Sequence, residues 1–170
     1  MAKLVPLANV ETDLIEQLLD RAFGPDRHAR TAYRMREGTQ WLEALSFAAL
    51  DEEDFLTGTI QVWPVALSDP DGRPHPLLMI GPVAVLPERQ SEGFGKALML
   101  ATLEAVGPDA ALPQVMIGDP EYYGRFFGFT AEHTGGWHCP GPNDPARLLL
   151  RCSNPAILPQ KGMIGPWESS

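Results

Sequence analysis

The sequence predicts a mixed α/β fold, in which helices cover both faces of a mixed β-sheet. The first reason is that runs with helical spacing of apolar residues are interspersed with shorter strand-like runs. The second is the segment 80–96, where an apolar strand, a glycine-containing loop and an amphipathic helix follow one another directly. The third is composition: 170 residues, 44% of them hydrophobic and 21% charged, suffice for one domain with a packed core.

Turn and stop signals separate the predicted elements. The first helix ends at Gly24-Pro25, and an acidic turn at 51–54 separates two strands. Turn residues at 68–72 bring the next strand beside the previous one. Pro120 stands at an early helical position, where its missing N–H is not needed. The predicted elements are, in order, a strand at 3–7, helices at 10–23 and 28–37, strands at 45–50, 55–63 and 77–85, a helix at 93–106, a strand at 115–117, a helix at 120–127, and strands at 130–133 and 147–152.

The C-terminal residues 153–170 contain several prolines and glycines, and we predict an extended tail without regular secondary structure there. The folded domain is therefore placed at 1–152. Within it, the proline-rich segment 139–145 is predicted to be a loop.

Composition argues against several classes of function. The net charge is −9, whereas nucleic-acid-binding proteins usually have a basic excess, so we expect no nucleic-acid partner. An acidic balance suits a cationic acceptor such as an amine, although solubility is its commoner reason. No apolar run approaches the ~20 residues of a membrane helix and no signal peptide opens the chain, so we expect a cytoplasmic protein without a membrane partner. Cys139 and Cys152 are too few for a disulfide scaffold and lack the spacing of a metal site.

The loop between the strand at 77–85 and the helix at 93–106 predicts a phosphate site. The first turn of a helix carries backbone N–H groups without internal partners, and the helix dipole adds partial positive charge there. Two glycines allow a close approach of the ligand to the backbone. A Rossmann fingerprint would need glycine at Leu98, and a P-loop would need serine or threonine at Ala97, so neither motif fits.

The pattern Gln-x-x-Gly-x-Gly after the segment VAVLPE resembles the acyl-coenzyme A signature of the GNAT N-acetyltransferase superfamily. A second block, VMIGDPEYY at 115–123 followed by Gly128-Phe129, is similar to the "GDPxYYxRFGF" block of one subgroup of predicted acetyltransferases. The resemblance covers most of residues 1–152. It implies a GNAT fold, in which the central strands splay apart and coenzyme A occupies the gap, and an acetyl-CoA-dependent N-acetyltransferase activity.

The resemblance also implies a set of cofactor-binding residues. The backbone of Val83, Ala84 and Val85 would hydrogen-bond the pantetheine arm, an arrangement that the flanking prolines favour because they remove ladder donors. Glu92 departs from the family pattern by placing a carboxylate in the loop, and we expect it to point outward and to cap the helix dipole. The residues expected to bind the diphosphate are Gln90, Ser91, Glu92, Gly93, Phe94, Gly95 and Lys96.

A tyrosine near the Gly128-Phe129 pair is the general acid that the resemblance implies, because the pKa of tyrosine, near 10, is close to that of a thiol. The usual spacing falls on Gly124, so we choose Tyr123 first and Tyr122 second and expect a bulge in the short helix to restore the register. Both rings could instead be packing aromatics.

The general base is not assigned, since residues 77–85 contain no ionisable group. Asp119 occupies the place where many relatives contact the pantetheine arm, although a helix N-cap is its commoner role. Other candidates are less specific, and the arginine-rich segment is predicted to be a solvated helix face rather than an acceptor site. The less specific candidates are His75, Glu88, His133 and His138. The arginine-rich segment contains Arg27, Arg30, Arg34 and Arg36.

Two functions remain open on the sequence alone. The first is direct acetyl transfer from acetyl-CoA to a small-molecule or peptide amine, without metal. The second is a non-catalytic module that binds or senses acyl-CoA. The sequence identifies no acceptor and leaves open whether the chain forms a homodimer.

Overall fold

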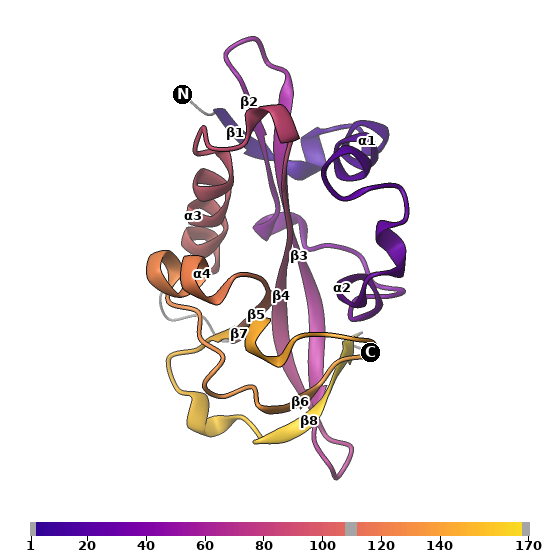
Figure 1. The fold of residues 1–170 in the computed structure, drawn as a ribbon, viewed down its shortest axis with the longest axis vertical. Coiled ribbons are helices and arrows are strands. Elements are labelled where there is room, and N and C mark those ends of the chain that lie inside the picture. The colour runs from indigo at the N-terminus through magenta and orange to yellow at the C-terminus, as the bar shows by residue number, and fades with distance from the viewer. Residues whose placement is uncertain (1–2, 108–111, 168–170) are drawn as a thin grey trace. The chain divides into compact units, whose positions relative to one another are not determined.

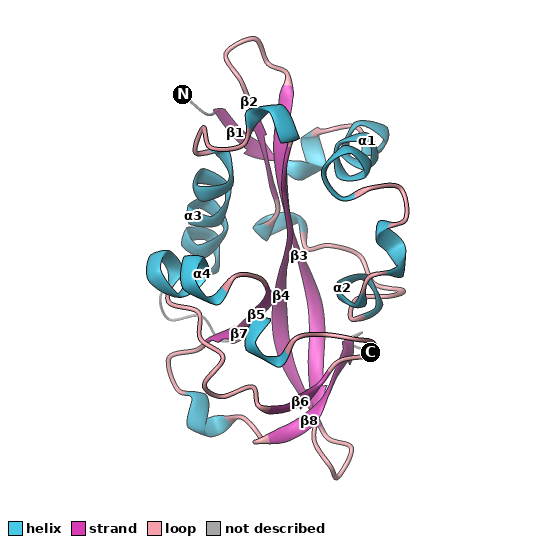
Figure 2. Ribbon diagram, in the orientation of Figure 1, coloured by secondary structure: helices cyan, strands magenta, loops and turns pink. Residues whose placement is uncertain are grey.

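The computed structural model describes residues 3–107 and 112–167, which form a mixed α/β fold as predicted (Figures 1 and 2). Short 3-10 turns connect several of the elements. The helices are α1 (Thr12–Phe23), α2 (Thr31–Arg34), α3 (Phe94–Val106) and α4 (Pro120–Phe127), and the strands are β1 (Lys3–Pro6), β2 (Phe47–Leu50), β3 (Leu56–Ser68), β4 (Pro74–Val85), β5 (Gln114–Ile117), β6 (Gly136–His138), β7 (Leu148–Arg151) and β8 (Lys161–Pro166).

The strands form one mixed sheet with the order β1-β2-β3-β4-β5-β7, and β8 pairs with both β3 and β6. The long strand β3 pairs with β2 along its first residues and with β8 along its last ones. β5 lies parallel to β4, through the pairs Leu78–Gln114 and Met79–Val115. This ladder stops at Met79, whereas β4 continues to Val85.

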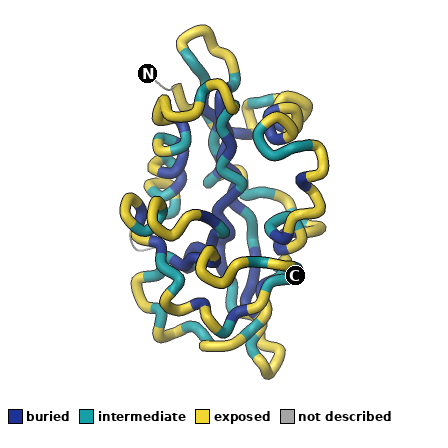
Figure 3. Tube along the Cα trace, viewed as in Figure 1, coloured by how far each residue is buried: buried dark blue, intermediate teal, exposed yellow. Residues whose placement is uncertain are grey.

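Two compact units can be distinguished along the chain. The first consists of Met1–His28, Trp41–Val62 and Gly81–Pro108. Its core contains α1 residues at helical spacing, and the exposed and buried faces of α1 and α3 alternate accordingly (Figure 3). Helix α1 ends at Gly24, whose φ of 93° is a conformation that favours glycine. The buried residues of this core are Leu7, Ile15, Leu18, Leu19, Ala48 and Ala84.

The second unit consists of Ala29–Gln40, Trp63–Ile80 and Asp109–Ser170. Alternate residues of β3 and β7 enter its core, as expected for strands with one buried face. Trp137 of β6 is fixed there by its indole N–H, which donates to the carbonyl of Pro159 at 2.9 Å. The buried residues are Met35, Val65, Leu67, Leu77, Met79, Val115, Trp137, Leu148, Leu150 and Ile164.

The helix predicted at 28–37 is largely absent. A 3-10 turn covers Arg27–Ala29, and α2 is limited to Thr31–Arg34. This segment is held in place by tertiary contacts rather than by further helical hydrogen bonds. The Thr31 hydroxyl donates to the carbonyl of Pro142, and Met35 is fully buried. The apolar spacing therefore predicts the buried face correctly but overestimates the length of the helix.

Two predictions for the C-terminal third are wrong. The strand predicted at 130–133 is reduced to a single bridge between Thr130 and Leu150, and the strand there is β6, at Gly136–His138. The tail predicted to lack secondary structure contains β8, although 168–170 lie outside the described residues. The glycines of β8 argue against a strand by sequence, but one of them, Gly162, has a packing reason. A Cβ at Gly162 would lie 2.6 Å from the carbonyl oxygen of Ser68, so only glycine lets β8 approach β3 this closely.

Gly162→Ala should therefore destabilise the protein, because the added methyl group meets a backbone oxygen that cannot move without distorting β3. We expect a loss of about 1–3 kcal/mol in the free energy of unfolding, measured by urea denaturation. Gly165→Ala is the matched control in the same strand, since a Cβ there meets nothing within 4 Å. Equal unfolding midpoints for the two variants would contradict the packing of β8 on β3.

Candidate functional site

The connection from β4 to α3 has an unusual backbone at two positions. Ser91 has a φ of 74° and Gly93, the N-cap of α3, a φ of 90°, both in the left-handed region. A Cβ at Gly93 would meet nothing within 4 Å, so the glycine is required by the backbone conformation and the space beside it is open. No side chain caps the first turn of α3. The N-terminus of a helix is a favourable place for an anionic ligand, and the phosphate site expected here from the sequence stays a prediction.

The remaining loop residues have distinct environments. Phe94 is buried and anchors the start of α3, whereas Gln90, Ser91, Glu92 and Lys96 are exposed. The exposed residues surround the left-handed turn. The loop therefore presents polar side chains and backbone to solvent while a buried aromatic ring fixes its position.

Gly95 is half-buried and packs beside β4. A Cβ there would lie 3.7 Å from Val85 Cγ2, which is an ordinary contact, so packing alone does not require this glycine. Within β4, Ala84 is buried, and Val83 and Val85 are half-buried. All three follow Met79, where the pairing of β4 with β5 stops.

Glu92 is exposed as predicted, but it makes no helix-capping hydrogen bond. Its carboxylate is bound by Arg89, with Nε–Oε2 and Nη2–Oε1 distances of 2.7 and 3.1 Å. These hydrogen bonds lower the pKa of Glu92. Sequence reasoning missed Arg89, although its spacing of three residues from Glu92 within a turn is a usable signal.

In the second unit, Asp119 is the N-cap of α4. Its Oδ1 accepts the backbone N–H of Glu121 at 3.0 Å, and Pro120 occupies the first helical position. The structure thus assigns Asp119 the common structural role that the sequence allowed. One carboxylate oxygen is already engaged in holding the helix.

Tyr123 is held in place by close packing on Gly118, at the end of β5. A Cβ at Gly118 would lie 2.7 Å from Tyr123 Cε2, so any other residue would displace the ring. Burial raises the pKa of Tyr123 above the ordinary value of 10.0, and the charges of Tyr122 and Asp119 add to the effect. Tyr122 is 36% exposed and meets Tyr123 edge to face, with ring centroids 5.0 Å apart. Sequence reasoning missed the role of Gly118.

The bulge predicted inside α4 is not observed, because Pro120–Phe127 is α-helical throughout. The helix is instead widened at its end. The N–H of Gly128, which has a φ of 79°, points to the carbonyls of both Gly124 and Tyr123. The N–H of Phe129 reaches back to the Tyr123 carbonyl at 3.3 Å. The additional residue is accommodated after the helix, where glycine permits the left-handed turn.

The other titratable candidates are largely engaged elsewhere or exposed. His75 Nε2 lies 3.1 Å from Asp69 Oδ2 in the turn between β3 and β4. Both carboxylate oxygens of Glu88 are bound by Arg21 Nη2, at 2.6 and 2.8 Å. His133 and His138 are exposed.

The arginine-rich segment is only partly a solvated face, which corrects the prediction for Arg27 and Arg36. These two side chains are only 3% and 5% exposed. Arg27 binds two carboxylates of α1, with distances of 2.5 Å to Glu16 Oε2 and 3.0 Å to Asp20 Oδ1. The Arg36 guanidinium lies 3.9 Å from the centroid of the Trp63 ring. The exposed members are Arg30 and Arg34.

Within residues 3–107 and 112–167, no helix combines the length and apolar character needed to cross a membrane. The same described part of the chain has no group of three or more His, Cys, Asp or Glu side chains arranged to hold a metal ion.

Comparison with solved structures identifies the fold. The chain is similar to a GNAT family N-acetyltransferase (YhbS) from Escherichia coli in complex with CoA, with a TM-score of 0.70, 22% sequence identity, and coverage of 98% of this chain and 89% of that one. It is also similar to a GNAT family acetyltransferase from Brucella melitensis in complex with acetyl-CoA, with a TM-score of 0.55, 26% identity, and coverage of 90% and 97%. No protein-family model and no curated protein matches the sequence.

Proposed function

We propose that this chain, which belongs by its fold to the GNAT superfamily, is an N-acetyltransferase that transfers the acetyl group of acetyl-CoA directly to a primary amine. The observation that carries the proposal is the connection from β4 to α3. It combines an uncapped helix N-terminus, a left-handed glycine and open space beside that glycine. Two structures with this fold contain CoA or acetyl-CoA, whose diphosphate is the kind of anion that such a turn binds.

The roles within the cofactor site follow from the chemistry of each part. The loop from Gln90 to Lys96 would bind the diphosphate through backbone N–H groups, and the Lys96 side chain adds a positive charge. The backbone of Val83, Ala84 and Val85 would bind the pantetheine arm, since these residues follow the end of the ladder with β5.

Tyr123 is suited to the role of general acid. Its raised pKa keeps the phenol protonated at neutral pH, so it can donate a proton to the thiolate as the carbon–sulfur bond breaks. Close packing on Gly118 fixes its ring, whereas Tyr122 is more exposed. We therefore keep Tyr123 as the first choice. Deprotonation of the acceptor ammonium is assigned to water, or to a group such as Asp119 or His138.

Direct attack by the amine is favoured over a covalent intermediate on Cys139. Burial raises the pKa of Cys139 to about 11, so its thiol is protonated at neutral pH and is a poor nucleophile. The acceptor in this proposal is a small-molecule or peptide amine, and neither a nucleic acid nor a membrane is part of the reaction. The proposed location is the cytoplasm, where acetyl-CoA and reduced thiols coexist.

Gly93→Asp tests the diphosphate site. The aspartate would strain the left-handed backbone and place a negative charge beside the bound anion, so acetyl-CoA should no longer raise the thermal unfolding midpoint. Gly72→Asp is the matched control, because Gly72 has a similar φ of 81°, also faces open space and lies in the turn between β3 and β4. If acetyl-CoA still raises the thermal unfolding midpoint of Gly93→Asp, the loop is not part of the binding site.

Tyr123→Phe tests the general acid. Turnover should fall by roughly 10²–10⁴-fold while the affinity for acetyl-CoA changes little, since the proton is needed only as the thiolate leaves. The ring contact with Gly118 is retained in phenylalanine, which makes the variant a test of the hydroxyl alone. In the wild type, ionisation of Tyr123 should lower the rate only above pH 10.0, the ordinary pKa of tyrosine.

Tyr122→Phe is the paired variant, and its turnover should remain within about fivefold of the wild type, well short of the loss expected of a general acid. A large loss of turnover in Tyr122→Phe, but not in Tyr123→Phe, would show that Tyr122 is the general acid instead of Tyr123. Acetyl-CoA binding without turnover in the wild type, across a range of amines, would favour the non-catalytic binding module.

A further inference from the structure

The loop that we propose for diphosphate binding contains a carboxylate of its own. Glu92 directly precedes Gly93, the N-cap of α3, so its negative charge lies within a Debye length of any anion at that turn. An unpaired carboxylate at this position would repel a diphosphate. The structure shows Glu92 paired, through two hydrogen bonds, with the guanidinium of Arg89.

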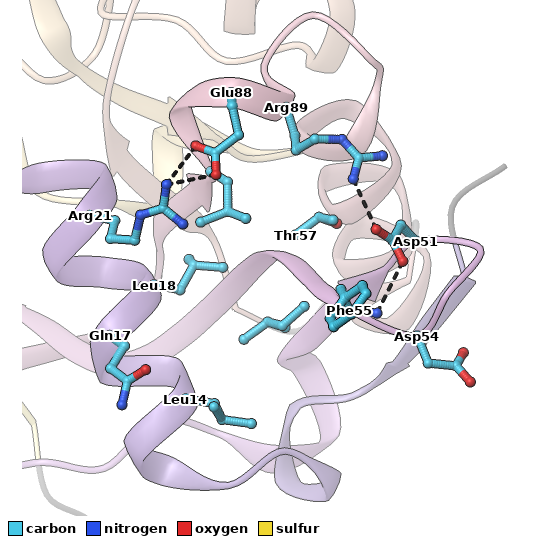
Figure 4. Close-up of a pocket in the computed structure, with 12 residues that line it drawn as sticks. Leu14, Gln17, Leu18, Arg21, Asp51, Asp54, Phe55, Thr57, Glu88 and Arg89 are labelled. Atoms are coloured by element: carbon cyan, nitrogen blue, oxygen red, sulfur yellow. Dashed lines mark hydrogen bonds and ion pairs between the residues drawn. The ribbon is translucent and has the colours of Figure 1, made fainter.

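Arg89 is itself fixed from a second direction. Its Nη1 lies 2.9 Å from Oδ2 of Asp51, in the turn between β2 and β3 (Figure 4). The other oxygen of Asp51 accepts the backbone N–H groups of Glu53 and Phe55, at 2.9 and 3.0 Å, which makes this carboxylate a rigid anchor. The backbone hydrogen bond from Phe55 is the main reason that the pKa of Asp51 is lowered.

A third contact places Arg89 against the helix that follows the loop. Its guanidinium carbon lies 5.3 Å from the centroid of the Phe94 ring, and Phe94 is buried at the start of α3. One side chain thus connects the turn between β2 and β3, the loop carboxylate and the first residue of the helix. Its side chain remains 30% exposed, so it is held by these partners rather than by burial.

We propose that Arg89 is a positioning residue for CoA, which neutralises and holds Glu92 so that the loop accepts a diphosphate, without contacting the phosphates itself. This inference rests on the proposed function. Three of the five N–H donors of the guanidinium are already used, two by Glu92 and one by Asp51. Loss of Arg89 would leave two carboxylates unpaired beside the loop. Loss of Glu92 together with Arg89 would remove the carboxylate nearest to the bound diphosphate.

The neighbouring groove provides a matched control. Arg89 and Asp51 line a groove of about 520 Å³ together with apolar side chains of α1 (Figure 4). Arg21 of α1 lines the same groove and binds Glu88, the residue next to Arg89. Arg21→Gln therefore removes the same charge and an ion pair with a neighbouring carboxylate, but it leaves the pairing of Glu92 intact.

The experiment is a calorimetric titration of CoA into the purified wild type and four variants at low salt. Arg89→Gln should raise the Kd of CoA by about tenfold or more, whereas Arg21→Gln should stay within about twofold. Glu92→Gln should bind at least as tightly as the wild type, since it removes a like charge. The double variant Arg89→Gln/Glu92→Gln should return to within about threefold of the wild type, a coupling that independent sites would not show.

Salt provides an independent readout. Screening should narrow the difference in Kd between Arg89→Gln and Arg21→Gln as the ionic strength is raised from about 0.01 M to 0.15 M, where the Debye length falls to about 8 Å. Each variant is first checked for an unchanged thermal midpoint without ligand. Should Arg89→Gln fail to fold, Arg89→Lys serves in its place. It keeps the charge but cannot bind both carboxylates in the same way, so its Kd should also rise.

The outcomes separate the two levels of the proposal. If the wild type does not bind CoA, both the proposed function and this inference are overturned. If the wild type binds and Arg89→Gln binds equally well, only the inference fails. A double variant that is as weak as Arg89→Gln would show that Arg89 contacts the diphosphate directly, which also overturns the positioning role.

Discussion

The reversal of the backbone between β4 and α3 is the constraint on which the proposed chemistry depends. Two departures into the left-handed region, at Ser91 and Gly93, let α3 begin without a capping side chain. A capped helix would have used its N–H groups internally, and a residue with a Cβ at position 93 would be strained. Phe94 then anchors the first turn of α3 by burial.

The electrostatics of this turn have to be balanced, because the chain places Glu92 where a diphosphate would be bound. The balance is supplied by Arg89, whose second partner, Asp51, comes from a distant turn of the same compact unit. Exposed ion pairs contribute little to stability, so the value of this arrangement lies in the charge presented to a ligand. In the second unit, a steric constraint has the corresponding role. Gly118 admits the ring of Tyr123, and burial raises the pKa of that phenol.

The sequence predicts well those features that local chemistry determines. Helices α3 and α4 are confirmed almost to the residue, since glycine and proline signals mark their ends. The GNAT fold was predicted from two short motifs and is confirmed by solved structures. Strand β8 was missed because its glycines resemble the composition of a loop, whereas Gly162 is there for a non-local reason, the close approach to β3. Arg89 was missed because its anchor, Asp51, is remote in sequence. The burial of Arg27 was missed because it depends on carboxylate partners on α1.

The most direct measurement of the proposed activity is the release of free thiol from acetyl-CoA by the wild-type protein, followed with a thiol reagent in the presence of a mixture of small primary amines. A direct N-acetyltransferase should release CoA only when both acetyl-CoA and an amine are present, and mass spectrometry should detect one acetylated amine for each thiol released. Binding of acetyl-CoA with no thiol released by any amine of the mixture, or with thiol released at the same rate without amine, would contradict acetyl transfer as the function of this chain.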